Sequence, residues 1–347
     1  MLRRAEVLER LVGALSGCDR LVLLGDVLEL RHSRLAEAFA AAEPVLRALG
    51  AALGADRKVV IVPGNHDHHL VAAWLERRAL GGRAEGLGLT SSVDWRAPEP
   101  LSAVAGWLAP AQVSAAYPGL WLRHDVYATH GHYLDRHTTV PALERIGAGV
   151  MGRVVRESPD GPARAEDYEA TLGPLYAWIH ATAQAGAGLI GDSAFGPSLR
   201  GWRTLTGGDG TRSWRQRGLA TAFPALISGL NWAGVGPLRP ELSGHELRRA
   251  GLLAFAEVLD RLGVDTGYAI FGHTHRAGPL PGDDESEWRT ELEAEIINSG
   301  SWIHQPHFLG DEPAVSPYRA GFGVVVREQD EPELVNLLDS VTAPARA

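Results

Sequence analysis

The sequence predicts an α/β protein built around a parallel sheet, and three observations support that fold class. Short apolar runs alternate with longer stretches of helical periodicity, as in strand–helix–strand units. The four clearest runs are each followed by a glycine, a proline or a histidine. With 347 residues, 45% of them hydrophobic and 22% charged, the chain has enough apolar material for an ordinary buried core. This composition excludes a wholly disordered chain, a collagen and a coiled coil.

The first elements in the chain are a helix and a strand–helix–strand unit. Apolar residues recur at helical spacing up to Gly17, which predicts an amphipathic helix over residues 2–16. Strands are predicted at Arg20–Leu24 and Lys58–Val62, and the alanine-rich helix between them is expected to be interrupted at Pro44. Such units form parallel sheets, in which functional groups collect beyond the carboxyl ends of the strands.

The same pattern returns later in the chain. Further strands are predicted at Val126–Thr129, Tyr268–Phe271, Glu295–Asn298 and residues 321–326. Ser243 and Glu246 have the spacing of a capping box, which predicts a helix from there through Leu262. This helix leads into the strand that ends at Phe271.

Residues 141–242 break this rhythm and are predicted to form an insertion. The stretch is rich in glycine, proline and alanine and carries four tryptophans, Trp178, Trp202, Trp214 and Trp232. A loop of this length without structure is improbable inside a compact domain, so we expect a mostly helical lid beside the strand ends. Residues 1–140 and 243–347 would then form one domain. The tryptophans fit either the lid's own core or an apolar surface over a substrate.

The charge and the cysteine content exclude several partners and sites. With 42 acidic and 33 basic side chains the net charge is -9, which repels a phosphate backbone and disfavours nucleic acid as a partner. Cys18 is the only cysteine, so neither an intrachain disulfide nor a thiolate metal cluster can form. Any metal site must therefore use His, Asp, Glu or Asn.

The sequence favours a cytoplasmic protein. Glu6 and Glu9 appear before any apolar core of signal-peptide length. Residues 170–191 and 218–238 lack Asp, Glu, Lys and Arg, but their glycines, prolines and polar residues make both poor membrane spans. We expect a cytoplasmic location, with peripheral contact to a membrane as an open alternative.

Five residues with the side chains of metal ligands follow the predicted strands: Asp26, Asn65, His130, His273 and His275. One sheet would bring these distant positions together at its carboxyl edge. A carboxylate, a carboxamide oxygen and neutral imidazoles suit Mn, Fe or Zn. Each residue also has an ordinary structural interpretation, because Asp after Gly is common in turns, Asn-His-Asp commonly caps a helix and isolated histidines are common on surfaces.

Four short motifs around these residues resemble, in order, signatures of the calcineurin-like metallophosphoesterases. They are GDVLE at 25–29, GNHD at 64–67, the strand-terminal His130 followed by glycine, and GHTH at 272–275. GNHD and GHTH are the specific ones, and the resemblance covers residues 20–134 and 265–303. It implies an α/β/β/α sandwich that hydrolyses phosphate esters or anhydrides.

By that resemblance the chain holds two divalent metal ions, each Mn, Fe or Zn. Asp26 would bridge them, Asn65, His130 and His273 would complete one site, and His275 would belong to the other. Two such cations polarise phosphoryl oxygens and activate a water for in-line attack.

Two residues of the GNHD motif have implied catalytic tasks. His66 would face the scissile phosphate and stabilise it or protonate the leaving oxygen, and Asp67 would hold His66 in place. His132 is a weaker candidate for substrate contact, with packing at the end of the strand as the alternative. Arg276, directly after GHTH, would bind substrate phosphate or form a surface ion pair, and the sequence leaves both open.

The chain departs from the family at its start. The family opens with a strand that ends in Asp-x-His, whose side chains bind the same metal as His275, and no such motif precedes Asp26. We expect this strand to lie upstream of Met1, with a true loss of the motif as the alternative. Without it the chain would keep one full metal site, and the second site would be incomplete.

The sequence therefore predicts a metal-dependent hydrolase of a small-molecule or lipid-linked phosphate. Lipid-linked substrates are included because the insertion lies where the lipid-processing UDP-diacylglucosamine hydrolases of this family carry a helical cap. Two other classes stay open: a degenerate phosphoesterase fold that serves as a binding or scaffold protein, and a membrane-associated module. The sequence predicts no oligomeric state.

Overall fold

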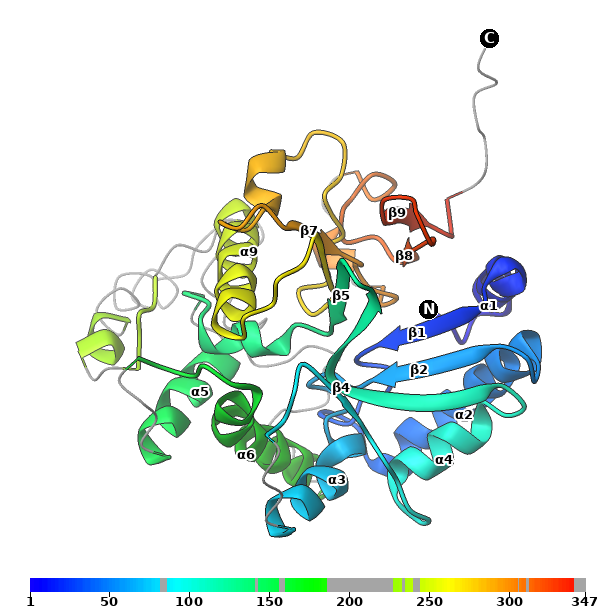
Figure 1. Cartoon of the computed structure of the whole chain (residues 1–347), viewed down its shortest axis with the longest axis horizontal. Coiled ribbons are helices and arrows are strands. Elements are labelled where there is room, and N and C mark those ends of the chain that lie inside the picture. The colour runs from blue at the N-terminus through cyan, green and yellow to red at the C-terminus, as the bar shows by residue number, and fades with distance from the viewer. Residues whose placement is uncertain are drawn as a thin grey trace, which may run out of the picture.

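The centre of the protein is a curled, mostly parallel sheet with helices packed against it (Figure 1). The computed structural model describes residues 1–81, 86–140, 143–155, 160–185, 227–232, 235–239, 244–304, 306–309 and 312–339. Helices and strands alternate along much of this length. The predicted α/β class is confirmed.

Seven strands form the central sheet. In sheet order they are β1 (Arg20–Leu24), β2 (Lys58–Val62), β4 (Gln112–Arg123), β5 (Val126–Thr129), β6 (Tyr268–Phe271) and β7 (Glu295–Asn298), with β3 (Thr90–Ser92) beside β4. Neighbouring strands are parallel except where β4 meets β3 and β5. A separate antiparallel pair consists of β8 (Phe322–Val325) and β9 (Glu333–Asn336).

The predicted strands coincide with β1, β2, β5, β6 and β7, and β8 lies within the predicted residues 321–326. β4 has no counterpart among them, because Pro118 and Gly119 lie in its middle and both are uncommon in strand interiors. The pairing partner changes near these residues. Positions 112–115 pair with β2, and the ladder with β5 starts at Gly119.

The helices of the N-terminal half flank one side of the sheet (Figure 1). They are α1 (Ala5–Ala14), followed by a short 3-10 turn at Leu15–Gly17, α2 (Leu35–Leu53), α3 (His69–Leu80) and α4 (Pro100–Trp107). In the C-terminal half, α9 (Gly244–Arg261) leads into β6 as predicted. Ser243 of the predicted capping box lies outside the described residues.

Helix α2 is continuous, so the predicted interruption at Pro44 was wrong. Pro44 and Ala40 both lie on the exposed side of the helix. The N–H that proline lacks would have bonded the carbonyl of Ala40, and because Ala40 is an exposed residue, water can satisfy that carbonyl. The proline therefore costs less here than in a buried helix.

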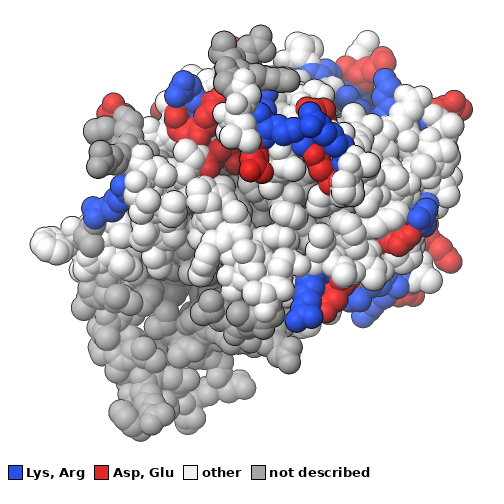
Figure 2. Space-filling view, turned by 90° about the horizontal axis from the view of Figure 1, so that it is seen from below, with Lys and Arg blue, Asp and Glu red and all other residues white. Residues whose placement is uncertain are grey.

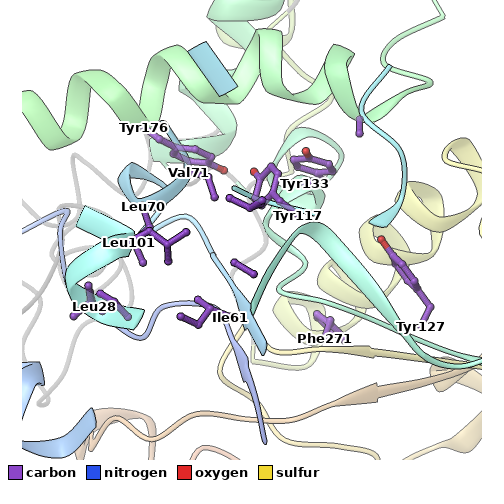
Figure 3. Packing of buried hydrophobic residues seen from close by; sticks show 14 of the residues in the cluster. Leu28, Ile61, Leu70, Val71, Leu101, Tyr117, Tyr127, Tyr133, Tyr176 and Phe271 are labelled. Atoms are coloured by element: carbon purple, nitrogen blue, oxygen red, sulfur yellow. The ribbon is translucent and has the colours of Figure 1, made fainter. Parts of the chain in front are cut away.

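Strand β2 carries side chains into hydrophobic clusters on both faces of the sheet. Val59 and Ile61 belong to the larger cluster, part of which is shown in Figure 3, together with residues of α2, α3 and α4. Val60 and Val62 belong to a smaller cluster, against which Val324 of β8 packs. This alternation is the period of two expected for a strand buried on both faces.

The described part of the insertion is largely helical, with α5 (Leu143–Val154) and α6 (Ala165–Gln184). Tyr168, Leu172 and Tyr176 of α6 are buried in the larger cluster, so this helix shares the main core. Residues 186–226 lie outside the described residues, and the lid as a whole stays a prediction.

Strand β1 is an end strand whose side chains are at most partly buried. Among the described residues it pairs with β2 alone. No residue of β1 is fully buried, whereas only the first residue of β2 is exposed. The expected further strand with Asp-x-His stays a prediction.

Figure 2 shows one face of the molecule, on which charged side chains of both signs are visible. Lysine and arginine side chains there lie beside aspartate and glutamate side chains, without a broad positive area. Within the described ranges, every helix is too short or too polar to cross a membrane.

Candidate metal centre

The loops that follow β1, β2, β5 and β6 meet at one edge of the sheet. Nδ1 of His130, after β5, lies 3.0 Å from the carbonyl oxygen of Leu24 at the end of β1. The N–H of Gly272, after β6, donates to the carbonyl of His130 (3.1 Å). The N–H of His66, after β2, donates to Oδ1 of Asp26 (2.9 Å). Hydrogen bonds thus tie all four loops together.

Four of the five predicted ligands lie side by side in this region. Nε2 of His130 is 3.2 Å from Oδ2 of Asp26 and 3.3 Å from Oδ1 of Asn65. Donor atoms of Asp26, His130 and His273 all lie within 4.8 Å of one another. We call Asp26, Asn65, His130 and His273 the Asp26 group. His275 is outside it, although it interacts electrostatically with Asp26.

The Asp26 group favours a positive charge. Burial opposes the charged forms of Asp26 and His130, but the attraction between them, together with the effect of His66 and His273 on Asp26, outweighs burial. The pKa of Asp26 therefore lies well below its ordinary value, and the pKa of His130 is raised to about 9. Burial and the neighbouring histidines lower the pKa of His275 to about 4, which leaves its ring neutral and able to bind a metal at neutral pH.

The donor set fits a divalent cation. Ligand atoms about 2.0–2.2 Å from one ion lie roughly 3.0–3.5 Å from each other, and the distances from His130 to Asp26 and Asn65 are 3.2 and 3.3 Å. Nδ1 of His130 lies against a backbone carbonyl, so Nε2 is the nitrogen that faces the oxygens of Asp26 and Asn65. A positive charge at Nε2 would be attracted to both oxygens. The raised pKa of His130 favours a proton at this place, and a bound cation would replace that proton.

Glycines permit the close approach of these loops. Gly25 and Asp26 have left-handed φ angles of 84° and 53°. A Cβ atom on Gly25 or Gly64 would overlap the ring of His130. A non-glycine residue with positive φ, such as Asp26, is strained, and such strain collects at functional sites.

We expect Gly64→Ala to weaken metal binding at least about tenfold. The added methyl would collide with Oδ1 of Asp26 and with the ring of His130, both of which hydrogen bonds hold in place. Calorimetric titration with Mn measures the affinity. Gly106→Ala, on α4 with nothing within 4 Å of the new methyl, is the matched control. An unchanged affinity in Gly64→Ala would contradict this packing.

His66 is oriented by Glu29. Nδ1 of His66 lies 2.8 Å from Oε2 of Glu29, and Nε2 lies 3.9 Å from Oδ2 of Asp26. Burial opposes protonation of His66, but the negative charges of Asp26 and Glu29 outweigh it and raise the pKa of His66. The ring therefore presents Nε2 to the Asp26 group.

Asp67 has a different task from the predicted one of holding His66. Its carboxylate accepts the backbone N–H groups of Gly64 (2.7 Å), Val27 (2.8 Å) and Asp26 (3.2 Å). Burial and the charge of Asp26 raise the pKa of Asp67 to about 6. Asp67 thus joins the loops after β1 and β2.

Two further side chains support the ligands. Oδ1 of Asp135 lies 2.9 Å from Nε2 of His273 and holds the ring of His273 in place. His132, with 1% of its surface exposed, cannot contact a substrate in this conformation. Its Nε2 lies 3.0 Å from the hydroxyl of Tyr117, and its ring lies 5.7 Å from that of His130 between centroids.

A carboxylate from the insertion lies next to these residues. Glu169 of α6 accepts hydrogen bonds from the hydroxyls of Tyr117 (2.5 Å) and Tyr133 (2.7 Å) and lies 2.9 Å from Nε2 of His68. Its side chain is only 12% exposed. Figure 3 shows Tyr176 of α6 beside Tyr117 and Tyr133. No local sequence pattern predicts this link between α6 and the sheet.

A cavity of about 210 Å³ lies beside His275. Its walls are mainly apolar and aromatic, with contributions from Leu252, Phe271, Trp288 and Tyr318. Part of the wall comes from α9 and part from the loops after β6.

Arg276 lines this cavity but is already paired. Its guanidinium makes two contacts with the carboxylate of Asp283 (2.5 and 2.8 Å) and lies 5.2 Å from the ring centroid of Trp288. Only 8% of Arg276 is exposed. The sequence left phosphate binding and an ion pair open for Arg276. In the structure Arg276 forms an ion pair with Asp283, and this pair is buried.

Comparisons of the chain with protein-family models, with curated proteins and with solved structures found no match in any of the three. The functional interpretation therefore rests on the residues and their geometry.

Proposed function

We propose that the chain is a metal-dependent hydrolase of phosphate esters or anhydrides, with the sandwich arrangement of the metallophosphoesterases. The observation that supports this most is the convergence of a carboxylate, a carboxamide and two imidazoles from four loops. Donor sets of this kind bind Mn, Fe or Zn. A shared cation would account for the approach of Nε2 of His130 to an oxygen of Asp26 (3.2 Å) and an oxygen of Asn65 (3.3 Å).

The Asp26 group would hold one cation, and His275 would contribute to a second, incomplete site. Bound cations supply Lewis-acid charge to the phosphoryl oxygens and lower the pKa of water. The neutral ring of His275 and the anionic Asp26 are both ready to bind without losing a proton.

His66 is the proposed proton donor to the leaving group. Its raised pKa favours the protonated ring, and Glu29 holds Nδ1 so that Nε2 faces the Asp26 group. As the bond between phosphorus and the leaving oxygen breaks, the proton on Nε2 passes to that oxygen. Nη1 of Arg31 lies 3.3 Å from Nε2 and can only donate, so it bonds Nε2 while that nitrogen is unprotonated; once Nε2 carries the proton, the guanidinium would turn toward the anionic substrate.

The cavity beside His275 is the proposed place of the substrate's organic group. Its apolar and aromatic walls suit the ring or the acyl chain of a small-molecule or lipid-linked phosphate. Arg276 has no part in this proposal, because Asp283 holds its guanidinium.

Hydrolysis of p-nitrophenyl phosphate and bis-p-nitrophenyl phosphate tests the proposed function. We expect turnover with added Mn, loss of turnover on chelation and recovery when Mn is restored. His273→Ala should lower the rate at least about 100-fold, because it removes a ligand of the Asp26 group. His124→Ala, whose side chain is 89% exposed, should leave the rate unchanged. If no metal supports turnover, the proposal fails and the scaffold alternative is favoured.

A further inference from the structure

A second set of metal-type donors lies next to the Asp26 group. One donor atom each of Glu29, His32 and His66 lies within 4.8 Å of the other two. Nδ1 of His32 is 3.1 Å from Oε1 of Glu29, and Nδ1 of His66 is 2.8 Å from Oε2. Both rings thus aim a nitrogen at the same carboxylate. His32 has no task in the proposed hydrolysis.

These three side chains are held in place and are open to solvent. Oε1 of Glu29 also accepts the backbone N–H groups of Arg31 (3.0 Å) and His32 (3.2 Å), which fixes the carboxylate against its own loop. The side chains of Glu29, His32 and His66 are 43%, 27% and 19% exposed. A cation can therefore reach the site without opening the protein.

Two imidazoles and one carboxylate, with one position left for water, form a ligand set typical of zinc. Mn prefers sites with more oxygen ligands, so the set favours zinc over the Mn that is added to support hydrolysis. Zinc would replace the two protons that now bridge the rings and the carboxylate. The donors would separate only slightly, from 2.8 and 3.1 Å to about 3.2–3.5 Å.

We propose that Glu29, His32 and His66 form a zinc site that inhibits the enzyme when it is filled, an inference whose inhibitory part rests on the proposed function. Zinc at Nδ1 of His66 would displace the hydrogen bond to Glu29. Nε2 would keep its proton, but a metal-bound neutral imidazole is a much weaker acid than an imidazolium. Transfer of that proton to the leaving oxygen would therefore slow.

One neighbouring charge opposes the binding of a cation at this site, and another favours it. The guanidinium of Arg31, 3.3 Å from Nε2 of His66, repels a cation on that ring. It lies on the Nε2 side, whereas zinc would bind at Nδ1. The anionic Glu29 is itself a ligand, and its direct contact offsets the more distant repulsion.

Direct binding is measured first, in a His273→Ala protein, whose Asp26 group lacks one ligand. Calorimetric titration with zinc is expected to show one equivalent bound, and adding His32→Ala should weaken that binding at least about tenfold. His124→Ala in the same background controls for the loss of an exposed histidine. A zinc affinity within twofold of the parent after His32→Ala overturns the site. This measurement needs no turnover, so its result is independent of the proposed function.

Inhibition is measured next, in the Mn-loaded wild-type chain. We expect zinc to slow hydrolysis of phenyl phosphate more than that of p-nitrophenyl phosphate, because the less basic p-nitrophenolate needs less protonation on leaving. His32→Ala should keep the Mn-supported rate and need at least about tenfold more zinc for half-inhibition. Equal inhibition of the two proteins would mean that zinc acts by replacing Mn in the Asp26 group. That outcome, or no inhibition at all, overturns the inhibitory role.

Discussion

Asp26→Asn is expected to abolish cation binding by the Asp26 group and to lower the proposed hydrolysis at least about 10³-fold. Asparagine keeps the shape of the side chain and the oxygen that accepts the N–H of His66. It removes the negative charge that outweighs burial at His130 and favours a positive charge there. A bound cation depends on the same negative charge. The decrease in cation affinity and in hydrolysis rate should therefore exceed the decrease caused by removing one neutral ligand.

Thermal unfolding with and without Mn measures this binding independently of turnover. At a Mn concentration 100 times its dissociation constant, the wild-type chain should be stabilised by about 2.7 kcal/mol. The Asp26→Asn chain should show no such stabilisation. Asp19→Asn, at an exposed position before the opposite end of β1, is the matched control and should respond to Mn as the wild type does. A variant at Asp26 that keeps the full response would contradict the assignment of this carboxylate.

The Asp26 group could be predicted from the sequence because its residues follow apolar runs of strand length. The end of such a run fixes where a side chain leaves the sheet, and the carboxyl edge of a parallel sheet collects these positions. His275 belongs to the same motif as His273, yet it lies outside the group. His275 has a left-handed φ of 63°, which sets the direction of the chain at this residue. The periodicity of apolar residues does not predict such a turn.

The partner of His66 could not be predicted in the same way. Glu29 and Asp67 are both carboxylates close to the motifs, and either would suit a histidine. The choice depends on how the curled sheet presents the N–H groups of Val27 and Gly64, which Asp67 accepts. With Asp67 occupied, Glu29 is left to orient the ring. This is a consequence of tertiary packing, which local patterns do not contain.

Two prolines illustrate the same limit. Local preference predicts a break at Pro44 and gives no strand around Pro118, but helix α2 and strand β4 continue through them. Pro44 is tolerated because it and Ala40, whose carbonyl it leaves without a helical partner, are both exposed to solvent. Around Pro118 the strand changes its pairing partner, so the residue does not interrupt one continuous ladder. The solvent exposure of a residue and the pairing of a strand depend on the whole fold, so the local sequence around each proline does not determine them.

Glu169→Ala is expected to reduce the free energy of unfolding by about 3–5 kcal/mol. The variant leaves the hydroxyls of Tyr117 and Tyr133 and the ring of His68 without their shared acceptor. Urea denaturation measures the loss. Glu43→Ala is the control for a surface carboxylate, because Glu43 pairs with Arg47 in solvent and such pairs contribute about 0–1 kcal/mol.

The pH dependence of this loss separates the charge of Glu169 from its packing. Burial by itself raises the pKa of Glu169, but the charge of His68 and the three hydrogen bonds outweigh burial and lower the pKa from its ordinary value of 4.5. A carboxylate with a lowered pKa stabilises the folded state above its unfolded-state pKa, and this stabilisation is lost as the pH falls through the folded-state value. The difference between the wild type and Glu169→Gln should therefore be complete at neutral pH and shrink below pH 4.5. A difference that stays constant down to pH 3 would mean that α6 is held by the shape of this side chain and not by its charge.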